Sequence, residues 1–99
     1  MATVTIHLAP NTLLAEFYFT SCAVDLAQKH FEQYTACKPF QTLQSDLDAA
    51  EECFDLTNNP SRQQEREALY GRGRSVSVGD VVEVDGCKYL CSSSGWWEM

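Results

Sequence analysis

The C-terminal segment from Arg74 to Met99 constrains the fold more than any other part of the chain, because its alternation and turn chemistry specify one β-hairpin. With a two-residue turn of type I′ at Asp85-Gly86, the facing pairs are Val84 with Cys87, Glu83 with Lys88, Val82 with Tyr89, and Val81 with Leu90. This register places opposite charges across from each other and gives each face a consistent set of apolar residues. A shift of one residue would destroy both agreements, so the sequence predicts this register.

The remaining pattern predicts strands first and helices second. Thr3 to Leu8 alternates as a strand, and Leu14 to Phe19, although ambiguous, is interpreted as a second strand paired with it. Apolar residues at helical spacing predict a helix from about Cys22 to Tyr34. Ser75 to Val78 alternates as a further short strand before a corner at Gly79-Asp80.

A second helix is predicted to follow Ser45, because Ser45 and Asp48 have the spacing of a capping box. Leu47, Ala50 and Phe54 are its predicted buried stripe, and Asn58-Asn59-Pro60 ends it. The polar segment 61–73 is expected to be a short helical turn or an exposed loop. These elements predict one α+β domain over residues 1–99, with an antiparallel sheet, two helices packed on one face and a C-terminal hairpin region at 74–99.

Length and composition limit the class of protein. Ninety-nine residues suit one domain with a modest core. No apolar run approaches the roughly 18 residues of a membrane span, and no signal-peptide pattern is present, so we expect a cytoplasmic protein without membrane attachment. The five cysteines include no Cys-x-x-Cys pair, which favours reduced thiols.

The formal net charge of −7 is concentrated in the first part of the chain. Residues 1–61 contain two lysines against eight acidic residues, whereas residues 62–99 contain five basic and six acidic residues. A negative field of this kind repels nucleic acid and favours a basic partner. Solubility alone is an equally simple explanation of the acidity.

The second predicted helix carries the most prominent charge cluster. Helical spacing places four carboxylates along one broad solvent face, those of Asp48, Glu51, Glu52 and Asp55. The helix contains no lysine or arginine to neutralise them. Such a row can occupy sites that phosphates fill on a basic groove, which is the basis of nucleic-acid mimicry, although a solvated helix face remains the alternative.

Catalytic and metal-binding signatures are missing from the sequence. The acidic segment lacks the glycine-centred loop of a calcium site. His7 and His30 belong to no motif, and no cysteine stands in a nucleophile signature. We therefore expect no enzymatic activity, no metal and no cofactor.

Two further features suggest contact surfaces. The segment from Arg62 to Arg74 contains four arginines, and together with the tryptophans it could form a small single-stranded nucleic-acid-binding module, an alternative that the overall acidity disfavours. In an extended tail Trp96 and Trp97 point to opposite sides, so one should seal the core and the other should remain at the surface as an interface anchor.

The motif from Arg74 to Gly86, followed by Tyr89-Leu90-Cys91 and Ser94-Gly95-Trp96, resembles the C-terminal segment of small YodL-like proteins of phages and conjugative elements. Leu47 to Pro60 is similar to the helix that precedes that hairpin. The resemblance covers about half of the chain and implies a mobile-element origin, with no catalytic residues to transfer.

This resemblance and the acidity lead to a functional hypothesis. We expect a counter-defence protein that binds a host defence protein or nucleoprotein complex stoichiometrically, for example a CRISPR effector or restriction complex with a basic channel. Asp48, Glu51, Glu52 and Asp55 would contact that channel, with Trp96 or Trp97 as anchor. The alternative is an accessory protein that modulates host machinery through the hairpin edge, and a homodimer is left open.

Overall fold

A computed structural model describes residues 1–71 and 73–99 of the chain. Its strands form one antiparallel sheet in the order β2-β1-β4-β5-β6, and β3 pairs with β1 outside this path. The strands are β1 (Ala2–Leu8), β2 (Thr35–Ala36), β3 (Phe40–Thr42), β4 (Val81–Val84), β5 (Cys87–Ser92) and β6 (Gly95–Glu98). The α-helices are α1 (Asn11–Phe17), α2 (Ala23–His30), α3 (Asp46–Asn58) and α4 (Gln63–Leu69), with 3-10 turns η1 (Phe31–Gln33) and η2 (Pro60–Arg62). The predicted α+β class with an antiparallel sheet is confirmed.

The β4–β5 hairpin has the predicted register at all four pairs. Both turn residues have positive φ, 48° at Asp85 and 90° at Gly86, as a type I′ turn requires. The Asp85 side chain also accepts a hydrogen bond from the Thr3 amide at 2.9 Å, which ties the turn to β1. The hairpin is therefore fixed both locally and by its neighbour in the sheet.

The aromatic tail continues the sheet as β6, a strand that the sequence analysis did not predict. Trp96 pairs with Cys91 and Trp97 pairs with Leu90. Since successive strand residues point to opposite faces, the two indoles lie on opposite sides of the sheet.

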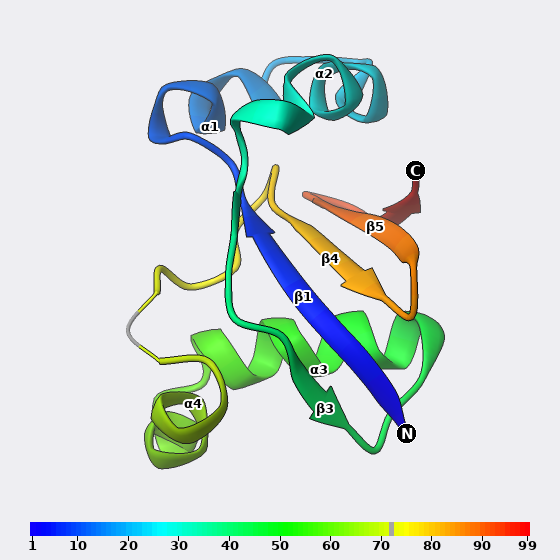
Figure 1. Ribbon diagram of the computed structural model, residues 1–99. Helices are drawn as coiled ribbons and strands as arrows, with labels where there is room; N and C mark the ends of the chain where they lie inside the picture. The colour runs from blue at the N-terminus through cyan, green and yellow to red at the C-terminus, as the bar shows by residue number, and fades with distance from the viewer. Residues whose placement is uncertain (72) are drawn as a thin grey trace.

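Helices cover both faces of the sheet, which differs from the prediction of two helices on one face. One core cluster contains Val82, Val84, Tyr89 and Cys91 packed with α3, and the other contains Val81 and Leu90 packed with α1 and α2. Figure 1 shows α1 and α2 on one side of the β1-β4-β5 strands and α3 on the other. Apolar side chains are completely buried on both faces: Val82 on one, and Val81 and Leu90 on the other.

The predicted strand from Leu14 to Phe19 is wrong, because residues 14–17 belong to helix α1 and residues 18–19 form the turn that follows it. Leu13 and Phe17, four residues apart, are buried together on one face of the helix. Tyr18 and Phe19, which suggested a strand, are exposed instead. The segment is helical because a helix brings Leu13 and Phe17 together against Val81 and Leu90 of the sheet.

Helix α3 has the predicted bounds but a different buried stripe. Leu47 and Phe54 are exposed, and the residues facing the sheet are Ala49, Ala50, Cys53, Leu56 and Thr57. Ser45 is the residue before the helix, yet its side chain makes no capping hydrogen bond. Of the large apolar side chains of α3, Leu56 is therefore in the core, whereas Leu47 and Phe54 lie outside it.

The segment that joins α4 to β4 is held by side chains rather than by strand pairing, so the predicted strand from Ser75 to Val78 is wrong. The amide of Val76 donates to Oγ1 of Thr57 at 3.0 Å, and Asn58 Nδ2 donates to the Val76 carbonyl at 2.9 Å. The predicted corner at Gly79-Asp80 is present, with the Asp80 amide donating to the Ser77 carbonyl. Residues 60–69 form the predicted short helical structure as η2 and α4.

Candidate functional site

The predicted carboxylates lie on the outer side of α3, away from the sheet. Asp48, Glu51 and Asp55 are exposed, and Glu52 is half-buried at the border of this side. Spacing of three and four residues brings their side chains to one surface. The helix thus presents the anionic face that its sequence predicts.

Arg62 neutralises part of this face, which corrects the expectation of four unpaired carboxylates. Its guanidinium donates to Glu52 at 2.7 Å, to Asp55 at 2.9 Å and to Glu65 at 2.8 Å. These bonds raise the pKa of Arg62, and the bond from Arg62 lowers the pKa of Glu65. α3 itself contains no basic residue, but η2 delivers one to it. Among the described residues, Asp48 and Glu51 take part in no ion pair.

The other arginines of the segment 62–74 are engaged in structural bonds. Arg66 donates to the carbonyls of Thr57 and Gly73 and to Oγ of Ser75. Arg74 binds the buried carboxylate of Asp80 with both terminal nitrogens, at 2.6 and 2.9 Å. Arg72 lies outside the described residues. The arginines of this segment that are described hold the chain together and do not form a free basic patch.

The two tryptophans occupy different environments, as the alternation predicts. Trp96 is half-buried against the core cluster on the α3 side of the sheet. Trp97 is 52 % exposed on the opposite side, where its indole N–H donates to Oγ of Ser92 at 2.8 Å. Of the two tryptophans, Trp96 therefore lies on the side of the sheet that α3 covers, and Trp97 lies on the other side.

The edge of α3 that faces β5 and β6 carries further acidic and apolar side chains. Glu98 pairs with Tyr89 across the β5–β6 ladder, so its side chain lies on the same face of the sheet as Tyr89. Burial raises the pKa of the Tyr89 hydroxyl, with smaller contributions from Cys87, Asp46 and Glu98. Burial likewise raises the pKa of the Cys91 thiol to about 11, and Glu51 adds to this shift. We call this surface the acidic-aromatic flank, and its residues are Asp46, Leu47, Glu51, Phe54, Trp96 and Glu98.

Leu47 and Phe54 belong to the flank by helical position. They stand four residues before and three residues after Glu51, so all three share one side of the helix. Phe54 is 38 % exposed and Leu47 is 47 % exposed. Both residues were predicted to lie in the core, and neither Asp46 nor Glu98 is among the site residues predicted from the sequence.

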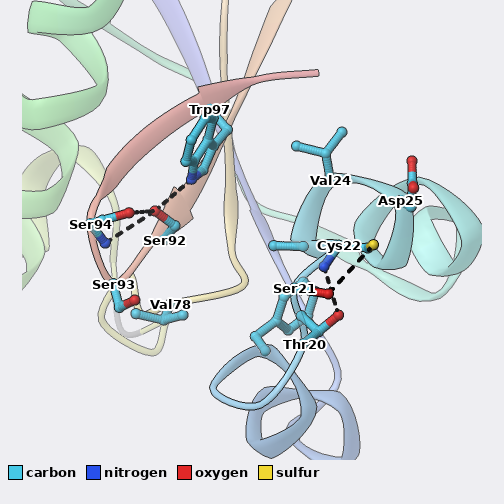
Figure 2. A pocket seen from close by; sticks show the side chains of 12 residues that line it. Thr20, Ser21, Cys22, Val24, Asp25, Val78, Ser92, Ser93, Ser94 and Trp97 are labelled. Carbon is cyan, nitrogen blue, oxygen red and sulfur yellow. Dashed lines mark hydrogen bonds between the residues drawn. The ribbon is translucent and has the colours of Figure 1, made fainter.

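Trp97 lines a cavity of about 390 Å³ on the other face, whose wall combines apolar side chains with several hydroxyl groups. Hydroxyl groups reach it from two segments, Thr20 and Ser21 between α1 and α2, and Ser92 to Ser94 at the end of β5 and in the turn to β6 (Figure 2). Ser92 is the centre of this group. Its hydroxyl accepts hydrogen bonds from the Trp97 indole N–H and the Ser94 amide, and it donates one to the Gly95 carbonyl. The cavity offers hydrogen-bonding groups beside an indole face, and its lining contains no histidine.

Comparison with known protein families, with curated proteins and with solved structures finds no match for this chain. Within residues 1–71 and 73–99, no helix is long and apolar enough to cross a bilayer. The same residues contain no group of three or more His, Cys, Asp or Glu side chains suited to hold a metal ion. The predicted site residues fall in four places: Asp48 and Glu51 on α3, without an ion-pair partner in the part of the chain that the structure describes; Glu52 and Asp55 at Arg62; Trp96 on the α3 side of the sheet; and Trp97 on the opposite side.

Proposed function

We propose that this chain is a phage or mobile-element counter-defence protein that binds stoichiometrically to a basic, nucleic-acid-binding surface of its target, such as the channel of a CRISPR effector or restriction complex. The observation that carries the proposal is the exposed pair Asp48 and Glu51 on α3, which has no cationic partner among the described residues. The YodL-like resemblance of the hairpin supports the mobile-element origin.

The mechanism follows from the chemistry shared by carboxylates and phosphates. Both are anionic oxygen acceptors for charge-assisted hydrogen bonds from lysine and arginine. Asp48 and Glu51 lie one helical turn apart on a rigid element, so little ordering is needed when they dock. The net charge of −7 steers the encounter with a basic surface.

The Arg62 network adds to this surface without cancelling it. One guanidinium serves the three carboxylates of Glu52, Asp55 and Glu65, so the network keeps an excess of negative charge. Fixed side chains in such a network lose less conformational freedom on binding than isolated ones. A target lysine or arginine would find Asp55 and Glu65 already oriented and more than half exposed.

The test is a paired charge reversal. Asp48→Lys with Glu51→Lys leaves the Arg62 network intact, and Glu16→Lys with Glu32→Lys makes the same change in net charge at exposed positions on α1 and η1. A tagged pull-down during infection with mass spectrometry identifies the target, and titration into target-catalysed cleavage of labelled DNA measures inhibition.

We expect the α3 variant to lose about tenfold or more in apparent affinity, which corresponds to ~1.4 kcal/mol. The control variant should lose only the smaller effect of long-range charge, which added salt removes. Equal inhibition by both variants would refute the α3 surface. Tight retention of the wild-type chain on single-stranded DNA, with no protein target, would refute the proposal as a whole.

A further inference from the structure

Strand β6 is an open edge of the sheet. The Met99 amide donates to the Lys88 carbonyl at 2.9 Å, and hydrogen-bonded pairs alternate along an antiparallel ladder. Gly95, Trp97 and Met99 therefore direct their backbone groups to β5. The N–H and C=O groups of Trp96 and Glu98 point outward and have no partner strand among the described residues.

The opposite edge of the sheet is interrupted. The outer side of β1 is shared by β2, of two residues, and β3, of three residues. Between them the Cys37 amide donates to the Ile6 carbonyl at 2.8 Å. β6 is thus the continuous edge at which another strand can add.

The two sides of β6 differ in chemistry. On the α3 side an added strand would lie beside Trp96 and Glu98, the two residues of the acidic-aromatic flank that belong to β6. Neither Glu51 nor Glu98 takes part in an ion pair among the described residues. On the other side it would lie beside the Trp97 indole and the serine hydroxyls of the cavity that Trp97 lines (Figure 2). Side chains of a strand alternate between the faces, so the edge selects an alternating sequence.

We propose that β6 takes up an extended segment of the partner as an additional strand, with lysine or arginine side chains on the α3 side and small or apolar side chains on the other. This inference rests on the proposed function, for which it specifies the chemistry of the partner. Main-chain hydrogen bonds to Trp96 and Glu98 provide the pairing, and Glu51 and Glu98 select the basic residues.

Charge disfavours a second copy as the occupant. Antiparallel pairing of two β6 strands places both α3 helices on the same side of a shared sheet, because the two-fold axis is perpendicular to it. The acidic flanks of two chains of charge −7 would then lie side by side. A basic strand is complementary to the same surface.

The experiment uses a fluorescent hexapeptide of alternating lysine and valine, with anisotropy as the readout. Glu98→Pro removes an outward N–H group, and the matched control Glu98→Ala removes the same carboxylate but keeps that donor. We expect Glu98→Pro to bind about tenfold more weakly than Glu98→Ala. With the wild-type chain, backbone N-methylation of the peptide should abolish binding, and glutamate in place of lysine should do the same.

Equal binding by the proline and alanine variants, equal binding of the N-methylated peptide, or no binding to the wild-type chain would each overturn the inference. A dimer in sedimentation that Glu98→Pro dissolves, without peptide binding, would assign the edge to a second copy and also overturn it. Loss of target inhibition in the Asp48→Lys/Glu51→Lys variant would still support the proposed function in these cases. Peptide binding with unchanged inhibition by that variant would support the edge and refute the α3 surface.

Discussion

Replacement of Asp80 by alanine should be among the most destabilising single changes in this chain. The Asp80 carboxylate is fully buried and accepts four hydrogen bonds: from the Ala9 amide at 2.8 Å, the Ser77 amide at 2.7 Å, and Arg74 at 2.6 and 2.9 Å. It thereby joins the end of β1 to the segment that leads into β4. Arg74 also donates to the carbonyls of Ala9 and Ser75, whereas the amides of Ala9 and Ser77 have no other acceptor among the described residues.

The expected loss follows from what the substitution leaves behind. Two backbone amides lose their acceptor, and the Arg74 guanidinium, whose side chain is only 28 % exposed, loses its counter-charge. Removing one partner of a buried ion pair costs about 3–5 kcal/mol. A domain of this size has a free energy of unfolding of roughly 5–15 kcal/mol, so a large fraction of the stability would disappear.

Urea unfolding followed by tryptophan fluorescence measures this loss. A double-mutant cycle with Arg74→Met separates the ion pair from the two amide bonds, because the double variant lacks both charges. We expect a coupling energy of about 2 kcal/mol or more between Asp80 and Arg74. A loss below about 1 kcal/mol in Asp80→Ala would show that this carboxylate does not organise the segment.

Two further perturbations test the packing of the core. Gly79→Ala should lower the free energy of unfolding by about 2–4 kcal/mol, because φ is +101° and a Cβ atom would stand 2.5 Å from the Phe17 ring. The control Gly86→Ala, with φ +90° and open space around the new atom, should lower it by about 1 kcal/mol. Equal shifts of the two variants in the urea midpoint would contradict this prediction. The free energy of unfolding should also fall as the pH rises above about 9, because burial raises the pKa of Cys53 to about 12 and that of Cys91 to about 11. The folded state then holds protons that the unfolded thiols release. Between pH 8 and pH 10.5, urea unfolding should show a smaller loss of stability in the Cys53→Ala/Cys91→Ala variant than in the wild-type chain.

The hairpin could be predicted because its determinants are local. The Asp85-Gly86 turn, the Glu83 and Lys88 pair and the alternation all lie within ten residues and agree on one register. Helix α3 was predictable for a similar reason, since Pro60 limits its end and its residues favour helix. Where turn residues, charge pairs and hydrophobic alternation within a short segment favour the same structure, that structure can be predicted without knowledge of tertiary contacts.

Long-range contacts decided the elements that were predicted wrongly. The segment 14–19 satisfies both a strand and a helix pattern, and burial of Leu13 with Phe17 against β4 and β5 selects the helix. The segment 75–78 alternates as a strand, but Thr57 of α3 satisfies the backbone of Val76. No pattern within either segment contains this information.

The Arg62 network was missed for the same physical reason. Charge patterning along a helix detects partners three or four residues apart, whereas Arg62 lies ten residues after Glu52 and seven after Asp55. The turn η2 reverses the chain after Pro60 and returns Arg62 to α3. The sequence therefore predicted the position of the carboxylates correctly and their electrostatic state only in part.

The misjudged stripe of α3 and the unpredicted flank have one common cause. The residues of α3 that face the sheet are mostly small, with Ala49, Ala50 and Cys53 completely buried. A stripe of small side chains fills its contact with the strands without using Leu47 or Phe54, and hydropathy alone ranks these larger residues first for the core. Their exclusion from the core leaves apolar surface beside Glu51 on α3. If the large apolar residues of α3 faced the sheet, only acidic side chains would remain on its exposed side. Because Leu47 and Phe54 are exposed instead, this side is amphipathic, which suits the partner strand that we propose.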